Sequence, residues 1–211
     1  MLGAGYDKSM ARPLALITGG SRGLGRSMAE NLARRGIDVI ITYQSNADAA
    51  ADVVERMKQS GARATALKLD VGDVSTFSAF VSALKVQLET VFGRSRFDFL
   101  VNNAGAGAYA SLLETSEAQF DTLMNLQFKG VLFLTQALAP LLEDGGRILN
   151  VSTGLTRIIL PGYGAYAAMK AAVETMTVYL AKELGDRRIR VNVIAPGAIE
   201  TDFGGGAVRD N

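Results

Sequence analysis

Histidine and cysteine are both absent from the 211-residue sequence. Without them, acid–base catalysis by imidazole, attack by a thiol, disulfide bonds and zinc sites made of His or Cys are excluded. The formal net charge is only +1, so no excess of basic residues points to nucleic acid or to an anionic membrane surface. The sequence also lacks an apolar run near the ~20 residues that span a bilayer, and residues 1–13 lack the apolar core of a signal peptide. We therefore expect a cytoplasmic protein with no metal site and no nucleic-acid or membrane partner.

The lack of histidine gives weight to a tyrosine–lysine pair. Tyr166 and Lys170 are four residues apart in a segment with a helical pattern, which places them on the same face of a helix. A free tyrosine has a pKa of about 10, and a lysine ammonium within ~4–6 Å favours the phenolate. The pair is thus the strongest candidate for proton transfer near neutral pH, with Lys170 expected to lower the pKa of Tyr166. By itself the spacing also fits an ordinary amphipathic helix.

Apolar residues follow strand and helix patterns alternately along the chain. This alternation predicts an α/β protein whose parallel sheet is covered by helices on both faces. A glycine-rich turn after the first strand favours the doubly wound Rossmann arrangement with strand order 3-2-1-4-5-6. Strands are expected at 14–18, 38–42, 64–69, 97–101, 146–151 and 189–194, and helices at 24–35, 47–60, 74–92, 116–142 and 163–184.

No repeat or break in composition divides the chain. We expect a single domain over 14–202, preceded by a flexible leader at 1–13. Residues 203–211 are rich in glycine and poor in apolar side chains, so they are expected to be mobile.

The glycine-rich turn runs from Thr18 to Gly25 with the sequence TGGSRGLG. Gly19, Gly23 and Gly25 allow the backbone to turn sharply and to approach a pyrophosphate closely, while the following helix offers free N–H groups at its N-terminus. A plain strand-to-helix turn is the alternative. The position between a predicted strand and a predicted helix favours nucleotide binding.

The spacing G-x-x-x-G-x-G resembles that of the short-chain dehydrogenase/reductase family, in particular its 3-oxoacyl-carrier-protein-reductase-like members. Further motifs of that family follow in the same order, so the resemblance extends over 14–201. They are Asp70-Val71 after the third strand, Asn102-Asn-Ala-Gly105 after the fourth, Asn125 in the long helix, Tyr166 with Lys170, and Pro196-Gly197 through Thr201 after the sixth strand.

The resemblance implies a set of cofactor contacts. Asp70 and Val71 are expected at the adenine ring, and the residues after the sixth strand are expected at the nicotinamide. The implied cofactor-binding residues are Gly19, Ser21, Arg22, Gly23, Leu24, Gly25, Tyr43, Gln44, Asp70, Val71, Asn102, Ala104, Gly105, Tyr166, Lys170, Pro196, Gly197, Ile199 and Thr201.

The resemblance also implies the catalytic roles. Tyr166 is expected to act as general acid or base, Lys170 to lower its pKa and hold the nicotinamide ribose, and Asn125 to support a water linked to Lys170. The family places a serine thirteen residues before the tyrosine, where this chain has Thr153, directly after Ser152. Threonine carries the same hydroxyl, and strand alternation turns Ser152 away if Thr153 faces the site. A structural hydroxyl at a strand end is the alternative for Thr153.

The end of the second strand bears on the choice of cofactor. Relatives specific for NAD place an acidic residue there, whereas this chain has Tyr43 and Gln44, with no carboxylate until Asp48. Arg22 in the glycine turn offers a guanidinium to a 2′-phosphate, unless it is simply a solvated cation. NADP(H) is therefore expected over NAD(H).

These observations predict an NADP(H)-dependent oxidoreductase that transfers hydride between nicotinamide and a carbonyl or secondary alcohol. The alternative is an NADP-binding regulatory protein or a catalytically weakened relative. Residues 106–110, 155–160 and Tyr163 contain a single charge, Arg157, so a small uncharged or apolar carbonyl substrate is expected. By resemblance, we also expect a homodimer or homotetramer. Family members usually continue for about fifty residues beyond Thr201, so the chain is expected to be a truncation or to omit a disordered end.

Overall fold

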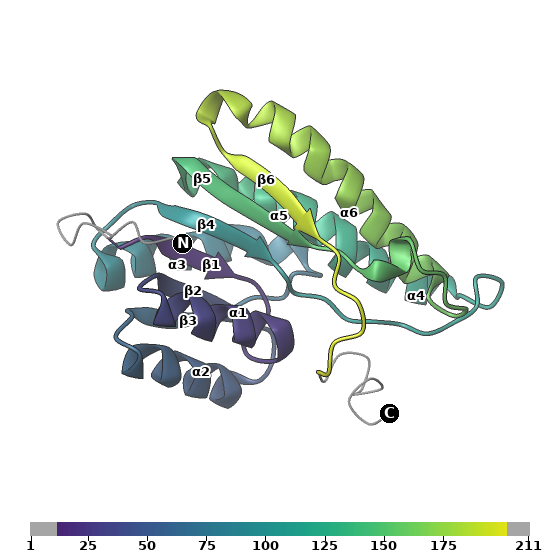
Figure 1. Ribbon diagram of the computed structural model, residues 1–211, viewed down its shortest axis with the longest axis horizontal. Helices are drawn as coiled ribbons and strands as arrows, with labels where there is room; N and C mark the ends of the chain where they lie inside the picture. The colour runs from purple at the N-terminus through teal and green to yellow at the C-terminus, as the bar shows by residue number, and fades with distance from the viewer. Residues whose placement is uncertain (1–11, 202–211) are drawn as a thin grey trace, which may run out of the picture.

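The computed structural model describes residues 12–201. Within them, all six strands form one parallel sheet in the order β3-β2-β1-β4-β5-β6 (Figure 1). The predicted α/β class and Rossmann strand order are therefore confirmed. The strands are β1 (Leu14–Ile17), β2 (Asp38–Tyr43), β3 (Ala64–Lys68), β4 (Phe97–Asn102), β5 (Leu142–Val151) and β6 (Arg190–Ile194).

Within residues 12–201, helices cover one face of the sheet and the β1–β3 part of the other face, where the strands are apolar on both sides, whereas Arg190, Asn192 and Ile194 of β6 are exposed. On one face, Leu16 and Ile40 pack in the same core as Leu84 and Leu134; on the other, Ile17 packs with the helices nearest the N-terminus. The first face is covered by α3 (Phe77–Phe92), α5 (Gly130–Leu138) and α6 (Gly164–Glu183), and the second by α1 (Gly23–Arg34) and α2 (Ala47–Gln59).

The helix predicted at 116–142 is not continuous. It begins with a capping box, in which Ser116 and Gln119 bond each other's backbone N–H groups. It then comprises α4 (Glu117–Met124), a π-turn (Asn125–Lys129), α5 and a single 3₁₀ turn (Ala139–Leu141). The regular hydrophobic period does not reveal a π-turn, which inserts one residue into the helical ladder. Strand β5 consequently starts at Leu142, four residues before the predicted position.

The predicted leader and tail are only partly described. Arg12 and Pro13, at the end of the predicted leader, contact the domain: the N–H of Asp38 donates to the Pro13 carbonyl at 2.8 Å, and the Arg12 guanidinium bonds the Gly61 carbonyl. Residues 1–11, and the segment 203–211 predicted to be mobile, lie outside the described residues. In the described part of the chain, no helix has the length and apolar character needed to cross a membrane.

Candidate active site

The glycine-rich turn joins β1 to α1 at the carboxyl edge of the sheet, where ligands of open α/β sheets bind. Gly19 and Gly23 have φ of 65° and 53°, in the left-handed region that favours glycine. A Cβ on Gly19 would lie 2.9 Å from the Cα of Ala104, and one on Gly25 would lie 2.2 Å from the Gly19 carbonyl oxygen. The turn thus presents bare backbone and packs directly on the loop after β4.

Two residues outside the predicted set hold this turn against the loop after β4. The hydroxyl of Thr18 accepts hydrogen bonds from the N–H groups of Asn103 and Ala104 at 2.9 and 3.0 Å. The side-chain amide of Asn103 donates in return to the carbonyls of Thr18 and Gly19 at 2.9 and 3.2 Å. Thr18 and Asn103 both belong to motifs of the sequence, the glycine-rich turn and the Asn102–Gly105 motif. Their pairing could not be predicted, because the two residues lie far apart in the chain.

Asn102 does not present its side chain to the predicted cofactor side. Its amide donates to the side-chain oxygen of Asn150 at 2.8 Å and to the hydroxyl of Thr135 at 3.0 Å, and Asn150 in turn donates to Thr177 at 2.8 Å. All four residues are buried. The Asn102 side chain therefore links β4 to β5 inside the sheet, because a buried amide needs partners there, and the expected contact of Asn102 with the cofactor remains a prediction.

The predicted adenine end is assembled from β2 and β3. The Gln44 amide donates to the Asp70 carboxylate at 2.9 Å, and that carboxylate also accepts from the N–H of Gly72 at 2.8 Å. Val71 is buried against α3, whereas Arg22 is exposed immediately before α1. Tyr43 ends β2, and Ser21 and Leu24 are half-buried in the glycine turn.

Tyr166 and Lys170 lie side by side on α6, as their spacing predicts. The Lys170 nitrogen is 5.8 Å from the centroid of the Tyr166 ring and donates to the Val151 carbonyl at 2.9 Å. Only 5 % of Tyr166 and 4 % of Lys170 is exposed. The two groups are thus packed against the end of β5 with little access to solvent.

Burial determines the protonation of this pair. Desolvation raises the pKa of Tyr166 to about 12, and a hydrogen bond with Thr153 offsets part of that rise. Desolvation lowers the pKa of Lys170 to about 8. In these surroundings the pKa of Tyr166 is raised rather than lowered, because desolvation by burial is the largest influence on it, and the effect expected of Lys170 on that pKa remains a prediction.

The two adjacent hydroxyls at the end of β5 point in different directions. Thr153 shares a hydrogen bond with Tyr166, and its oxygen accepts from the N–H of Leu155 at 3.3 Å. Ser152 instead donates to the carboxylate of Glu174 at 2.7 Å. This is the arrangement expected from strand alternation. Of the two, Thr153 is the hydroxyl that meets the candidate acid.

In the π-turn, Gln127 rather than Asn125 reaches the loop after β4. Gln127 is fully buried, its amide donates to the Ala106 carbonyl, and its side-chain oxygen lacks a hydrogen-bond donor among residues 12–201. A Cβ on Gly105 would lie 3.0 Å from that oxygen. Asn125 is half-buried, and its carbonyl accepts the N–H of Gly130. Sequence reasoning missed Gln127 because the π-turn shifts the helical register.

The segment after β6 runs toward the N-terminus of α1 (Figure 1). Pro196 accepts a hydrogen bond from the N–H of Gly154 at 2.7 Å, which brings it next to Thr153. A Cβ on Gly23 would lie 3.7 Å from Thr201, so this segment also reaches the start of α1. Gly197 and Ile199 between them are exposed.

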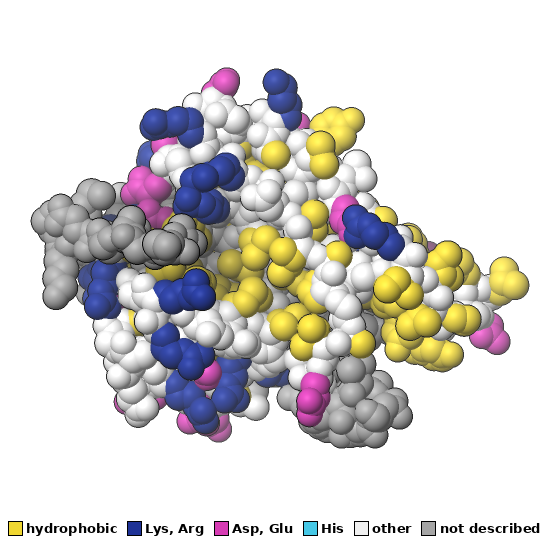
Figure 2. Space-filling view, viewed as in Figure 1, with side chains coloured by type: hydrophobic (Ala, Val, Ile, Leu, Met, Phe, Trp, Pro, Cys, Tyr) yellow, Lys and Arg dark blue, Asp and Glu magenta, His cyan; other side chains and the backbone are white. Residues whose placement is uncertain are grey.

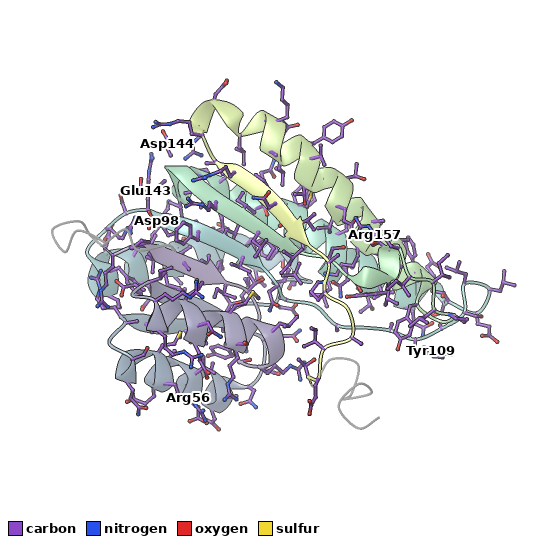
Figure 3. All side chains as sticks on the ribbon, viewed as in Figure 1. Arg56, Asp98, Tyr109, Glu143, Asp144 and Arg157 are labelled. Carbon is purple, nitrogen blue, oxygen red and sulfur yellow. The ribbon has the colours of Figure 1, made fainter. Side chains whose placement is uncertain are left out.

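Apolar side chains rim the site on the side of α4 and the N-terminus of α6. Figure 2 shows them gathered at the narrow end of the molecule, where Figure 3 labels Tyr109. The Tyr109 and Tyr163 rings meet edge to face, with centroids 5.4 Å apart. Exposed apolar residues in this rim are Tyr109, Leu112, Leu113, Ile158, Ile159 and Leu160.

Comparisons with known proteins identify the family. The model of the family described as short chain dehydrogenase matches residues 13–211. The chain belongs to the short-chain dehydrogenase/reductase family. It is therefore an oxidoreductase, in agreement with the resemblance seen in the glycine turn and in the tyrosine–lysine pair.

Three relatives show the range of the similarity. Hydroxynaphthalene reductase-like protein Arp2 of Metarhizium brunneum is 36 % identical over 93 % of this chain and 72 % of its own length. The angucycline C-6 ketoreductase LanV, solved with NADP and also with NADP and rabelomycin, is 39 % identical with a TM-score of 0.85, over 88 % of this chain and 72 % of LanV in the first structure. A short-chain dehydrogenase of Burkholderia cenocepacia, solved with NADP, is 37 % identical with a TM-score of 0.84, over 97 % of this chain and 82 % of its own.

The shifted pKa of Lys170 predicts a pH dependence of stability for this short-chain dehydrogenase. The pKa is 10.5 for an exposed lysine and about 8 in the fold, which corresponds to roughly 3 kcal/mol. Below pH 8 the fold bears the full cost of the buried ammonium, and this cost is lost as the pH rises toward 10.5, so stability rises. Tyr166 stays neutral in both states below pH 10 and acts only above it, where its raised pKa lowers stability.

Urea unfolding between pH 8 and 10 tests this expectation. The free energy of unfolding should rise with pH in the parent relative to Lys170→Met, which has no charge to lose. Lys182→Met, at an exposed position of the same helix, should keep the parent's rise. A parent and a Lys170→Met variant that differ by a constant amount across this range would contradict the assignment.

Proposed function

We propose that the protein reduces a carbonyl group with NADPH. The observation that carries the proposal is the buried contact of Thr153, Tyr166 and Lys170 beside a glycine-rich turn at the carboxyl edge of the sheet. The NADP-bound relatives and the names of the related reductases support it. They also favour an enzyme over a regulatory protein that only binds the nucleotide.

The residues present fit a dinucleotide. The bare backbone of Gly19 and Gly23 with the N-terminus of α1 suits a pyrophosphate. The exposed guanidinium of Arg22 suits a 2′-phosphate, and the strand end at Tyr43 and Gln44 carries no carboxylate to repel it. When bound, the nicotinamide supplies the hydride for the reaction.

The protein's own groups manage the charge on the substrate oxygen. Tyr166 is protonated at neutral pH because its pKa is about 12, so it can donate a proton as the oxygen becomes negative. Thr153, bonded to Tyr166, is placed to hydrogen-bond the same oxygen. Lys170, anchored by the Val151 carbonyl, adds positive charge beside the phenol and stabilises the tyrosinate left after transfer.

Gln127 completes the support of this site. Its bond to the Ala106 carbonyl ties the π-turn to the loop that carries Ala104 and Gly105.

The water-supporting role expected for Asn125 remains a prediction. The predicted roles of Asp70, Val71, Pro196, Gly197, Ile199 and Thr201 in binding the cofactor remain proposals as well. The expected cytoplasmic location also stays a prediction.

The substrate proposed is an uncharged, apolar carbonyl compound, and a ring system is favoured. The rim formed by Tyr109, Tyr163 and residues 158–160 offers an apolar wall with exposed aromatic rings. Arg157 is the one charge within 155–160, and it pairs with Glu174. The names of the relatives refer to hydroxynaphthalenes and to an angucycline, both aromatic compounds. Loss of reduced-nicotinamide absorbance in the presence of cyclic and linear ketones would test the activity and the preference together.

Tyr166→Phe is expected to keep the fold and the affinity for NADPH while turnover falls ~10²–10⁴-fold, the usual contribution of a positioned acid. Tyr179→Phe, at an exposed position on the same helix, serves as the control and should retain parental turnover. Thr153→Ser should be near neutral, and Thr153→Val should cost less than Tyr166→Phe. Ketone reduction at parental rate by Tyr166→Phe would refute the mechanism.

Arg22→Ala is expected to weaken NADPH binding about tenfold or more and NADH binding little, because only NADPH carries the extra phosphate. Calorimetric titration of both cofactors measures the difference. Arg26→Ala is the matched control, since Arg26 lies in the first turn of α1, four residues after Arg22, and pairs with Glu30 at 2.9 Å. Equal affinities of the parent for the two cofactors would overturn the proposed preference.

A homo-oligomer is proposed because one side of α6 is not covered by any element within residues 12–201. Its exposed positions carry Ala168, Ala171, Thr175, Val178 and Tyr179, without a charge until Lys182. A second copy of this helix offers the same uncharged surface, as an interface with twofold symmetry requires.

Light scattering at micromolar concentration should show a dimer or a tetramer. Val178→Glu should shift the population toward the monomer, because it places a charge in the proposed interface. Val86→Glu, at an exposed valine of α3, should leave the assembly unchanged. A monomeric parent would rule out the interface.

A further inference from the structure

Glu174 continues a row of side chains that begins with Tyr166 and Lys170. The three residues follow one another at intervals of four on α6 and therefore share one face of the helix. Each contacts a different one of three consecutive residues, the last of β5 and the two that follow it: Lys170 bonds the Val151 carbonyl, Glu174 bonds Ser152, and Tyr166 bonds Thr153. Only the first and the last of these contacts have a part in the proposed chemistry.

The carboxylate of Glu174 collects three groups from one loop. One oxygen accepts from the hydroxyls of Ser152 and Thr156 at 2.7 and 3.0 Å, and the other accepts from the Arg157 guanidinium at 3.2 Å. Figure 3 labels Arg157 beside α6, at the start of the apolar rim. The Glu174 side chain is only 20 % exposed. Hydrogen bonds to an ionised, partly buried carboxylate are stronger than those between neutral groups.

The loop that Glu174 holds carries Thr153. The Thr156 hydroxyl has one hydrogen, which it shares between the Glu174 carboxylate and the Thr153 carbonyl at 3.0 and 3.1 Å, so the group held by Glu174 also lies against the backbone of Thr153. Ser152 and Thr153 are neighbours with side chains on opposite sides of the strand. Fixing Ser152 on one side therefore fixes the rotation of the strand end, and with it the direction of the Thr153 hydroxyl.

We propose that Glu174 is a positioning residue: by binding Ser152 and Thr156 it holds the Thr153 hydroxyl against Tyr166. The inference rests on the proposed function for its kinetic consequence, but the geometric claim stands apart from it. A small displacement of a catalytic group lowers the rate of the chemical step more than it lowers binding. The effect is therefore expected in kcat, with the KM for NADPH little changed.

The kinetic test is a double-mutant cycle in the full chain. Glu174→Ala should lower kcat roughly tenfold, and Glu174→Gln, which keeps an oxygen acceptor at the same place, should recover most of the loss. In a Thr153→Ala background, Glu174→Ala should lower kcat no further, because the group it positions is gone. Glu183→Ala, at an exposed position near the end of the same helix, is the control and should leave kcat unchanged. If the kcat of the Thr153→Ala, Glu174→Ala double variant were lower by the product of the two single losses, the proposal would be overturned.

Hydrogen exchange supplies a readout that needs no activity. In Glu174→Ala the amides of Leu155, Arg157 and Ile158 should exchange faster, since they are bonded within the loop that Glu174 holds. Glu174→Gln should exchange at close to the parental rate, and so should Glu183→Ala. Unchanged protection in Glu174→Ala would refute the positioning role. If the parent binds NADPH but reduces no ketone, the proposed function fails while the exchange experiment still decides the role of Glu174.

Discussion

The contact of α6 with Val151, the last residue of β5, and with the two residues that follow it is the constraint on which the candidate site depends. A helix repeats its face every three to four residues, whereas a strand alternates at every residue. Here one face of α6 lies along residues 151–153, so that Tyr166, Lys170 and Glu174 each form a hydrogen bond with one of these residues. The side chains of the strand and the helix thereby fix one another's orientation. The glycine turn and the loop after β4 lie on the adjacent strand ends of the same sheet edge.

Burial at this contact shifts the pKa values of Tyr166 and Lys170 in opposite directions. Both the tyrosinate and the lysine ammonium lose solvent, so the neutral form of each is favoured. Placing Lys170 in these surroundings lowers stability at neutral pH, and the Val151 carbonyl only partly replaces the lost water. An apolar side chain could fill the position of Lys170 without this loss of stability. A buried ammonium there is therefore consistent with a functional site.

Much of the fold was predictable because it depends on local pattern. Buried parallel strands can be predicted from their apolar runs, and the turn after β1 from its glycines. Both depend on residues that are close together in the sequence. Strand alternation predicted that Ser152 and Thr153 face opposite ways, whereas the choice of Thr153 for the site came from the family resemblance. The role of Asn102 could not be predicted, since its partners Asn150 and Thr135 come from two other elements. Gln127 was missed for a related reason: a π-turn leaves the composition of a helix unchanged while altering which side chains face inward.

The π-turn at 125–129 has a consequence for insertions and deletions in this chain. An α-helix advances about 100° per residue, and the π-turn holds one residue more than a regular turn. Because the extra residue is taken up within one turn, α4 and α5 keep the facing they would have in an unbroken helix one residue shorter. Deleting a single residue there would therefore let them merge with little rotation of α4 relative to the sheet, and Leu123 would stay in its cluster with Tyr166 and Met169. Straightening the helix without a deletion would instead rotate α4 by about that angle and turn Leu123 away from Tyr166.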